Sequence, residues 1–248
     1  MDEFIKIEIN SYHKYKTMIR GTIVKRPSKH CKSPYVADVL LENGEEVIAH
    51  APSLGCCGLC EKGSIVYMIP LDKGKICTYS IWLSETNKIL VGIYPKNAEK
   101  MVETYIDHII PNVIKLEREK KILNSRFDFV GIDGDNRPFI LEVKSVPLCE
   151  NNIAYFPDGY RKKKTDVISP RALKHVQELE KMKQENYRCI LCFVVQRDDA
   201  SSFTISDKDI LYKDAVYKAI KNGVEVIAIK IAWDTNGNHI LKGLIALI

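Results

Sequence analysis

Short alternating runs of apolar and polar residues fill the first 93 positions of the chain. A side-chain period of two is typical of half-buried strands, and the turn sequences ENGEE, LDKGK and SETNK separate the runs. Several such strands with almost no helical periodicity indicate a small barrel or sandwich, and a five-stranded OB-type barrel fits the count. The clearest runs are FIKIEI at 4–9, MIRGTIV at 18–24, YVADVLL at 35–41, SIVYMIP at 64–70 and ICTYSIWL at 76–83.

The pattern changes near residue 95, where helical periodicity begins. Asn97 is predicted to cap a helix whose apolar stripe runs from Met101 to Ile109 and which ends at Pro111. A second helix is predicted from Ser169 as N-cap and Pro170 at the first helical position. Strands are predicted at 126–132, 139–146, 188–195 and 224–233, with a further helix between the last two strands and a last apolar segment at the end. We therefore expect a barrel domain in residues 1–93 and a mixed α/β domain in residues 94–248.

Composition is that of an ordinary folded protein. The 248 residues are 46% hydrophobic and carry a formal net charge of +5, which permits a polyanionic partner without requiring one. The longest apolar run, 189–195, is far shorter than a membrane span, and the start MDEFIKIEIN is unlike a signal peptide. We expect a cytoplasmic protein.

Eight cysteines leave two interpretations open. Without an export signal, reduced thiols are expected rather than disulfides. Cys57 and Cys60, with the adjacent Cys56, have a spacing compatible with zinc. Burial as small apolar side chains is the commoner fate of cysteine.

The predicted hairpin at 126–146 contains the residues that point to chemistry. Alternation places Asp128 on one strand, and Glu142 and Lys144 on a common face of the next. The two carboxylates and the carbonyl of Val143 form a donor set that suits Mg²⁺ or Mn²⁺. Lys144 would then orient a water or stabilise the charge of a phosphoryl transition state. This layout is typical of phosphodiester cleavage.

A charged strand face has a simpler interpretation. Carboxylates and lysines often face each other across solvated strands, where they contribute only modest stability. The apolar neighbours Ile140 and Val143 favour partial burial instead.

Basic residues are concentrated after the hairpin and in the predicted barrel. Between residues 160 and 175, six cations face one acid, which indicates either contact with a phosphate backbone or a solvated surface loop. On the predicted second helix, Arg171, Lys174 and His175 share one face, which a solvated helix would also show. Tyr35 in the barrel is placed to stack on a base or simply to pack. The predicted nucleic-acid-binding residues are Lys25, Arg26, Tyr35, Arg161, Lys162, Lys163, Lys164, Arg171, Lys174 and His175.

Taken in order, these segments resemble the sugar fermentation stimulation protein A (SfsA) family across nearly the whole chain. The matching stretches include GTIVKR, VADVLLENGEEVIAH, FILEVKSVPL, AYFPDG, SPRALKHVQELE and NGVEVIAIKI. The resemblance implies an OB-type barrel followed by a domain similar to PD-(D/E)xK nucleases, with nucleic-acid binding. The barrel loop HAPSLGCC departs from the family's usual HCPNTGSM, which leaves the role of that loop open.

The same resemblance implies roles for individual residues. Asp128 takes the place of the first motif acid, and Glu142 and Lys144 take the place of the ExK pair. Either Glu103 or Glu119 is implied as a further metal-binding carboxylate. The start of the predicted second helix, with Arg171, Lys174 and His175, matches a family motif.

The sequence thus favours a Mg²⁺-dependent nuclease that acts on nucleic acid, with DNA favoured over RNA. The alternative is a non-catalytic DNA-binding regulator on a nuclease-like scaffold. A sugar-binding barrel is weaker than either, because it rests only on what OB folds can bind.

Overall fold

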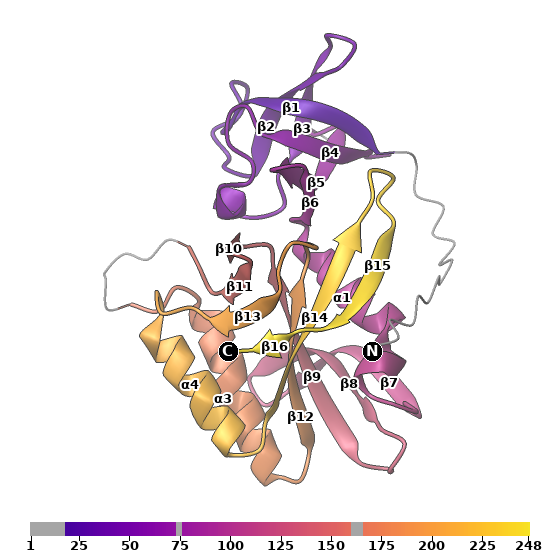
Figure 1. Cartoon of the computed structure of the whole chain (residues 1–248), viewed down its shortest axis with the longest axis vertical. Coiled ribbons are helices and arrows are strands. Elements are labelled where there is room, and N and C mark those ends of the chain that lie inside the picture. The colour runs from indigo at the N-terminus through magenta and orange to yellow at the C-terminus, as the bar shows by residue number, and fades with distance from the viewer. Residues whose placement is uncertain (1–17, 73–75, 160–165) are drawn as a thin grey trace. The chain divides into compact units, whose positions relative to one another are not determined.

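The computed structural model describes residues 18–72, 76–159 and 166–248, which form two compact units (Figure 1). The first unit contains the described residues up to Tyr94, together with residues 196–199 and 230–243. The second contains the rest, from Pro95 onward. None of the helices within the described ranges has the length and apolar character needed to cross a membrane.

The first unit contains a closed five-stranded barrel. Its strands follow the order β3-β2-β1-β4-β5, and a parallel pairing of β3 with β5 closes the ring. A short strand, β6, pairs with β5 outside the ring, and the 3₁₀ turn η1 spans Gly55–Gly58. The barrel confirms the predicted architecture, and the predicted strand at 4–9 lies outside the described residues. The strands are β1 (Ile19–Lys25), β2 (Val36–Leu41), β3 (Glu46–His50), β4 (Ile65–Pro70), β5 (Tyr79–Thr86) and β6 (Ile89–Gly92).

The barrel interior is filled by the apolar residues of the alternating pattern, such as Ile23, Val39 and Met68. Cys56 and Cys60 are buried in this core, whereas Cys57 is exposed. Two of the three clustered cysteines therefore pack as small apolar side chains.

A mixed sheet of order β15-β14-β12-β9-β8-β7 contributes β7, β8, β9 and β12 to the second unit, and its strands β9 and β12 are parallel. A smaller sheet has the order β10-β11-β13-β16. The strands are β7 (Lys115–Ile122), β8 (Ser125–Ile132), β9 (Pro138–Val146), β10 (Cys149–Glu150), β11 (Ile153–Phe156), β12 (Arg188–Val195), β13 (Ser202–Ile205), β14 (Glu225–Trp233), β15 (His239–Leu244) and β16 (Ala246–Leu247). The helices are α1 (Pro95–Thr104), α2 (Ile106–Ile109), α3 (Pro170–Gln184) and α4 (Ile210–Lys221).

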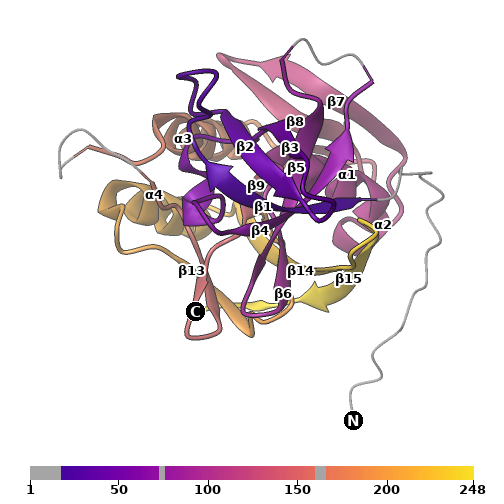
Figure 2. The ribbon, with the colours of Figure 1, turned by 90° about the horizontal axis from the view of Figure 1, so that it is seen from above.

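Helices cover both faces of this sheet. Figure 2 shows α3 and α4 on one side and α1 on the other. The apolar face of α3 packs on Phe193 and Leu191 of β12, inside a core that also includes Val216 of α4. The predicted start of α3 is confirmed: Ser169 caps it by accepting a hydrogen bond from the Ala172 N–H, and Pro170 opens it.

The first predicted helix differs in detail. The chain leaves the helix at Tyr105, so one predicted helix becomes α1 and α2. Asn97 does not cap it, because the helix already begins at Pro95 and Asn97 is buried inside it. Proline fits the first turn, since its missing N–H has no helical partner there.

Gly131 of β8 lies close to both neighbouring strands. A Cβ at this position would lie 2.1 Å from the Lys115 carbonyl oxygen and 2.6 Å from the ring of Phe139. The first contact is with backbone, so Gly131→Ala forces β7 and β8 apart. We expect the substitution to lower the free energy of unfolding by about 1–3 kcal/mol in urea denaturation. Lys121→Ala, at an exposed position of β7, is the control; equal midpoints for the two variants would contradict this packing.

Candidate active site

Two carboxylates lie where strands β8 and β9 separate. The ladder between these strands pairs Phe129 with Leu141 and ends there. The next residues on the two strands are Asp128 and Glu142. Asp128 Oδ2 accepts a hydrogen bond of 2.8 Å from the Val143 N–H, so a side chain replaces the next backbone rung. The fork in the sheet thus brings together the two acids that the sequence singled out.

Glu142 is almost fully buried, with 2% of its surface exposed. Its Oε1 contacts both the Lys144 ammonium and Nδ1 of His175. Its Oε2 is buried and has no hydrogen-bond partner. A buried carboxylate oxygen without a partner is costly, and an oxygen-seeking cation would offset that cost. The donor set therefore fits a divalent ion.

The two acids titrate in opposite directions. Burial and the nearby Glu142 carboxylate raise the pKa of Asp128 to about 7. Burial also acts to raise the pKa of Glu142, but the Lys144 ammonium and the contact with His175 outweigh it and the net shift is downward. Glu142 is thus the ionised partner, and Asp128 titrates near neutral pH in the absence of a cation.

A third carboxylate comes from helix α1. Burial raises the pKa of Glu99, and its charge contributes to the raised pKa of Asp128. Arg118 bridges Glu99 and the more exposed Glu103, at 3.1 and 2.6 Å. Sequence reasoning named Glu103 and missed Glu99, one helical turn earlier. Residues four apart share a helix face, but which of the two carboxylates lies nearer Asp128 depends on how α1 packs on the sheet.

Glu119 lies on β7, between the paired residues that flank Asp128 on β8. Its backbone is left-handed, with φ of +50°, which is uncommon for a residue other than glycine and often occurs at functional sites. Its side chain pairs with Arg126 at 3.2 Å on the surface. Of the two carboxylates considered from the sequence, Glu119 lies beside Asp128 along the sheet and Glu103 points to Arg118.

Comparisons with known proteins identify the family of the chain. Residues 96–237 match the model of the "Sugar fermentation stimulation protein RE domain". The chain belongs to the sugar fermentation stimulation protein family. A homolog from Pseudoalteromonas atlantica is 35% identical over 86% of this chain and 90% of its own length. A homolog from Shewanella frigidimarina is 31% identical over 89% of this chain and 93% of its own length.

A solved structure supports the fold. The chain is similar to the structure titled as Pyrococcus furiosus SfsA in complex with Ca²⁺, with a TM-score of 0.79 and 21% sequence identity. The similarity covers 93% of this chain and 96% of that one. The family and the mixed α/β fold with its barrel, both expected from the sequence, are thereby confirmed.

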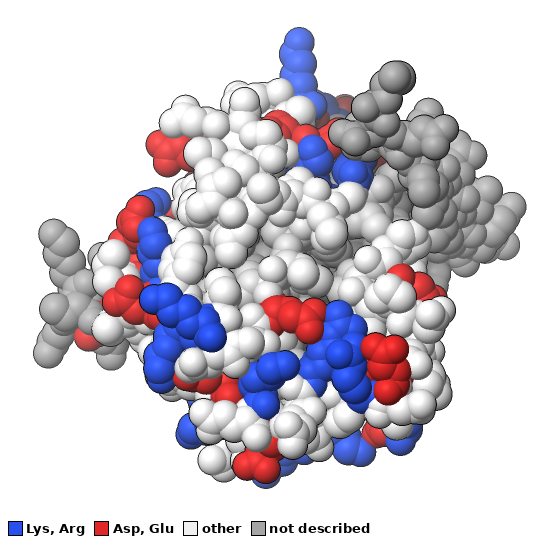
Figure 3. Space-filling view, turned by 60° about the horizontal axis from the view of Figure 1, so that its bottom comes forward, with Lys and Arg blue, Asp and Glu red and all other residues white. Residues whose placement is uncertain are grey.

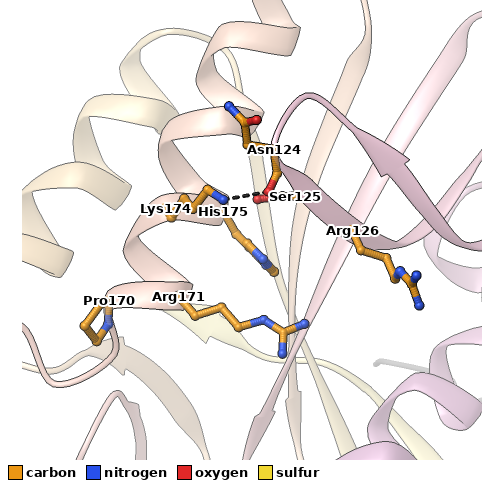
Figure 4. A pocket seen from close by; sticks show the side chains of 7 residues that line it. All are labelled: Asn124, Ser125, Arg126, Pro170, Arg171, Lys174 and His175. Atoms are coloured by element: carbon orange, nitrogen blue, oxygen red, sulfur yellow. Dashed lines mark hydrogen bonds between the residues drawn. The ribbon is translucent and has the colours of Figure 1, made fainter.

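In this SfsA-family chain, the basic residues of α3 lie beside the acids. Arg171 and Lys174 are exposed and His175 is buried, and all three line one pocket (Figure 4). The Lys174 ammonium donates to the Asn124 carbonyl oxygen at 2.6 Å. The contact of His175 with Glu142 joins this helix to the paired acids.

The other predicted contact residues that the structure describes belong to the barrel unit. Lys25 and Tyr35 are exposed in the barrel unit, and their proposed contacts stay predictions. Arg26 donates to the carbonyl oxygens of Pro34 and Ser53, which gives it a structural role. The face in Figure 3 carries Lys and Arg side chains interspersed with Asp and Glu, so it is mixed rather than uniformly cationic. The predicted residues Arg161, Lys162, Lys163 and Lys164 lie outside the described residues.

A second set of ligand-type side chains lies in the barrel. His30, Asp38 and Glu46 each bring one ligand atom within 4.8 Å of the others. Asp38 already accepts hydrogen bonds from Ser28 and the Lys29 N–H, and Glu46 pairs with the Lys29 ammonium. Lys29 therefore already supplies positive charge to this group. At the fork of β8 and β9, by contrast, Oε2 of Glu142 has no partner.

Proposed function

We propose that this protein is a divalent-metal-dependent nuclease that hydrolyses phosphodiester bonds. Asp128, Glu142 and Lys144 form its proposed active site. The observation that carries the proposal is the pair of carboxylates at the fork of β8 and β9, the buried Glu142 and the half-buried Asp128. Glu142 has an unpartnered oxygen and contacts the largely buried Lys144, and Asp128 has a raised pKa. Withdrawing these ionisable groups from water costs stability, and such perturbed groups cluster at functional sites.

Each residue has a distinct role in this proposal. Asp128, Glu142 and the Val143 carbonyl would hold the ion, and either Glu99 or Glu119 would complete the oxygen set. When bound, the ion supplies Lewis acidity that lowers the pKa of water and offsets phosphate charge. Lys144 orients the attacking water or stabilises the developing negative charge. His175 holds the Glu142 carboxylate in place through its Nδ1 contact.

The Ca²⁺ named for the Pyrococcus furiosus relative supports a divalent cation here as well. Ca²⁺ and Mg²⁺ both take oxygen ligands, and carboxylate sites of nucleases commonly use Mg²⁺ or Mn²⁺. We propose Mg²⁺ or Mn²⁺ as the active ion and DNA as the preferred substrate over RNA.

A cleavage assay on linear DNA and on RNA tests the proposal. The full chain is expected to cut at least one of them with Mg²⁺ or Mn²⁺ and to stop when a chelator is added. Lys144→Ala is expected to lower the rate by about 10²–10³, the usual cost of losing one preorganised charge. Lys181→Ala, an exposed lysine near the end of α3, controls for net charge and should cut at the wild-type rate. Binding without cleavage under every metal condition would contradict the proposal.

A further inference from the structure

A solvent-open pocket of about 420 Å³ lies beside the paired acids, at the start of helix α3. Figure 4 shows that its lining side chains come from two parts of the chain, residues 124–126 at the start of β8 and the first turns of α3, and that the Arg126 side chain points away from the others. The lining residues are Asn124, Ser125, Arg126, Pro170, Arg171, Lys174 and His175. The pocket therefore has three cationic side chains and no acidic one in its lining.

The cations differ in how far they are already neutralised. Arg126 pairs with Glu119, and Lys174 lies 3.9 Å from the buried Glu178. The Lys174 ammonium uses one hydrogen bond on the Asn124 carbonyl and retains further N–H donors. Arg171 has no hydrogen-bond or ionic partner within the described part of the chain. A free guanidinium offers a fork of donors that matches phosphate oxygens.

Ser125 supplies an independent sign that the pocket has a ligand. It is 5% exposed, and its hydroxyl Oγ is buried without a hydrogen-bond partner. A buried hydroxyl in this state has lost its hydrogen bonds to water without gaining others, which destabilises the folded protein. Alanine at the same position would avoid that cost. A bound ligand that accepts a hydrogen bond from the Ser125 hydroxyl would offset it instead.

The backbone adds positive potential in the same place. The first turn of a fifteen-residue helix carries partial positive charge, which favours anions at that end. Pro170 and Arg171 occupy this turn. The imidazole of His175 also reaches the pocket, and its Nε2 makes no hydrogen bond among the described residues.

We propose that this pocket binds a phosphate group of the nucleic acid strand, held by Arg171, Lys174 and Ser125. The inference rests on the proposed function and names a second contact for its substrate. Because His175 lines the pocket and also contacts Glu142, the bound phosphate is held in register with the paired acids. The phosphate is either an internal diester or a terminal monoester, and the chemistry of recognition is the same for both.

Equilibrium binding of labelled duplexes to the full chain, in chelator so that no cleavage occurs, tests this proposal. The duplexes end either in 5′-phosphate or in 5′-hydroxyl, and inorganic phosphate serves as a competitor. Arg171→Ala is expected to weaken binding about tenfold, as for loss of a charge-assisted contact, and Ser125→Ala about threefold to tenfold. Lys181→Ala is the matched control for lost charge and should change affinity less than about twofold.

The stability of Ser125→Ala separates a binding role from a structural one. Removal of an unpartnered buried hydroxyl should leave the unfolding midpoint unchanged or raise it, while binding weakens. Tighter wild-type binding of the 5′-phosphate duplex, with the preference lost in Arg171→Ala, identifies a terminal phosphate. Equal weakening of both duplexes identifies an internal one.

The proposal is overturned if Arg171→Ala and Ser125→Ala bind both duplexes as Lys181→Ala does. It is also overturned if only Arg171→Ala weakens binding while Ser125→Ala does not. Because binding is measured without metal, failure of cleavage by the wild type leaves this result intact. Conversely, if the binding assay shows that the pocket does not bind phosphate, the proposed metal-dependent cleavage is still tested by its own assay.

Discussion

Glu142→Gln is expected to lower the rate of metal-dependent cleavage by roughly a thousandfold, which corresponds to about 4 kcal/mol of lost transition-state stabilisation. Glutamine has nearly the same shape as glutamate but lacks the charge that holds a divalent ion. Of the two oxygens of the Glu142 carboxylate, only the buried Oε2 has no hydrogen-bond partner in the protein. The substitution therefore acts directly on the proposed ion. The measurement is initial rate against Mg²⁺ concentration.

Two controls make this result specific. Glu185→Gln removes one exposed carboxylate beyond the end of α3 and should cut at the wild-type rate. Circular dichroism of Glu142→Gln checks that the variant folds, because Lys144 and His175 both lose their charged partner. A folded Glu142→Gln protein with at least a tenth of the wild-type rate would remove Glu142 from the reaction.

Asp128→Asn is expected to stabilise the metal-free protein at alkaline pH. The pKa of Asp128 is raised from 3.8 to about 7, so between these values the folded state holds a proton that the unfolded state has lost. Folding stability therefore falls as the pH rises through this window, by up to roughly 4 kcal/mol above about pH 7. Asparagine cannot ionise, and its carbonyl can still accept from the Val143 N–H.

Urea unfolding in chelator measures this effect. We expect Asp128→Asn to be more stable than the wild type at about pH 8, with the difference shrinking as the pH falls toward 4. Added Mg²⁺ should then stabilise the wild type and leave Asp128→Asn unchanged, since only the carboxylate gains from the ion. If the difference in stability between Asp128→Asn and the wild type is the same at about pH 8 as near pH 4, the pKa of Asp128 is not raised by burial and by Glu142.

The sequence predicted that Asp128 and Glu142 lie close together because the strands that carry them have a clear local pattern. Alternating apolar residues identified β8 and β9, and the hairpin register, which pairs Phe129 with Leu141, brings the two acids toward each other. Helix α3 was equally accessible, since Ser169 and Pro170 form a standard helix start. What remained hidden was the contact of His175 with Glu142, which depends on how α3 packs on the sheet.

Other elements carried no usable local signal. Strand β7 has the sequence KLEREKKI, and its mostly polar side chains reflect an edge strand that buries little apolar surface. Glu99 was overlooked because its role depends on the placement of α1 against the sheet. Likewise, residues 196–199 and 230–243 belong to the same compact unit as the barrel. This assignment depends on contacts between segments that are distant in the sequence, and hydrophobic periodicity does not predict such contacts.

Diffraction from crystals soaked in Mn²⁺, recorded for its anomalous signal, shows directly whether a divalent ion binds at Asp128 and Glu142. We expect a peak within about 2.4 Å of carboxylate oxygens of both residues, with the Val143 carbonyl in the same shell. A peak confined to the barrel group of His30, Asp38 and Glu46, or no peak beside the fork of β8 and β9, would contradict this expectation.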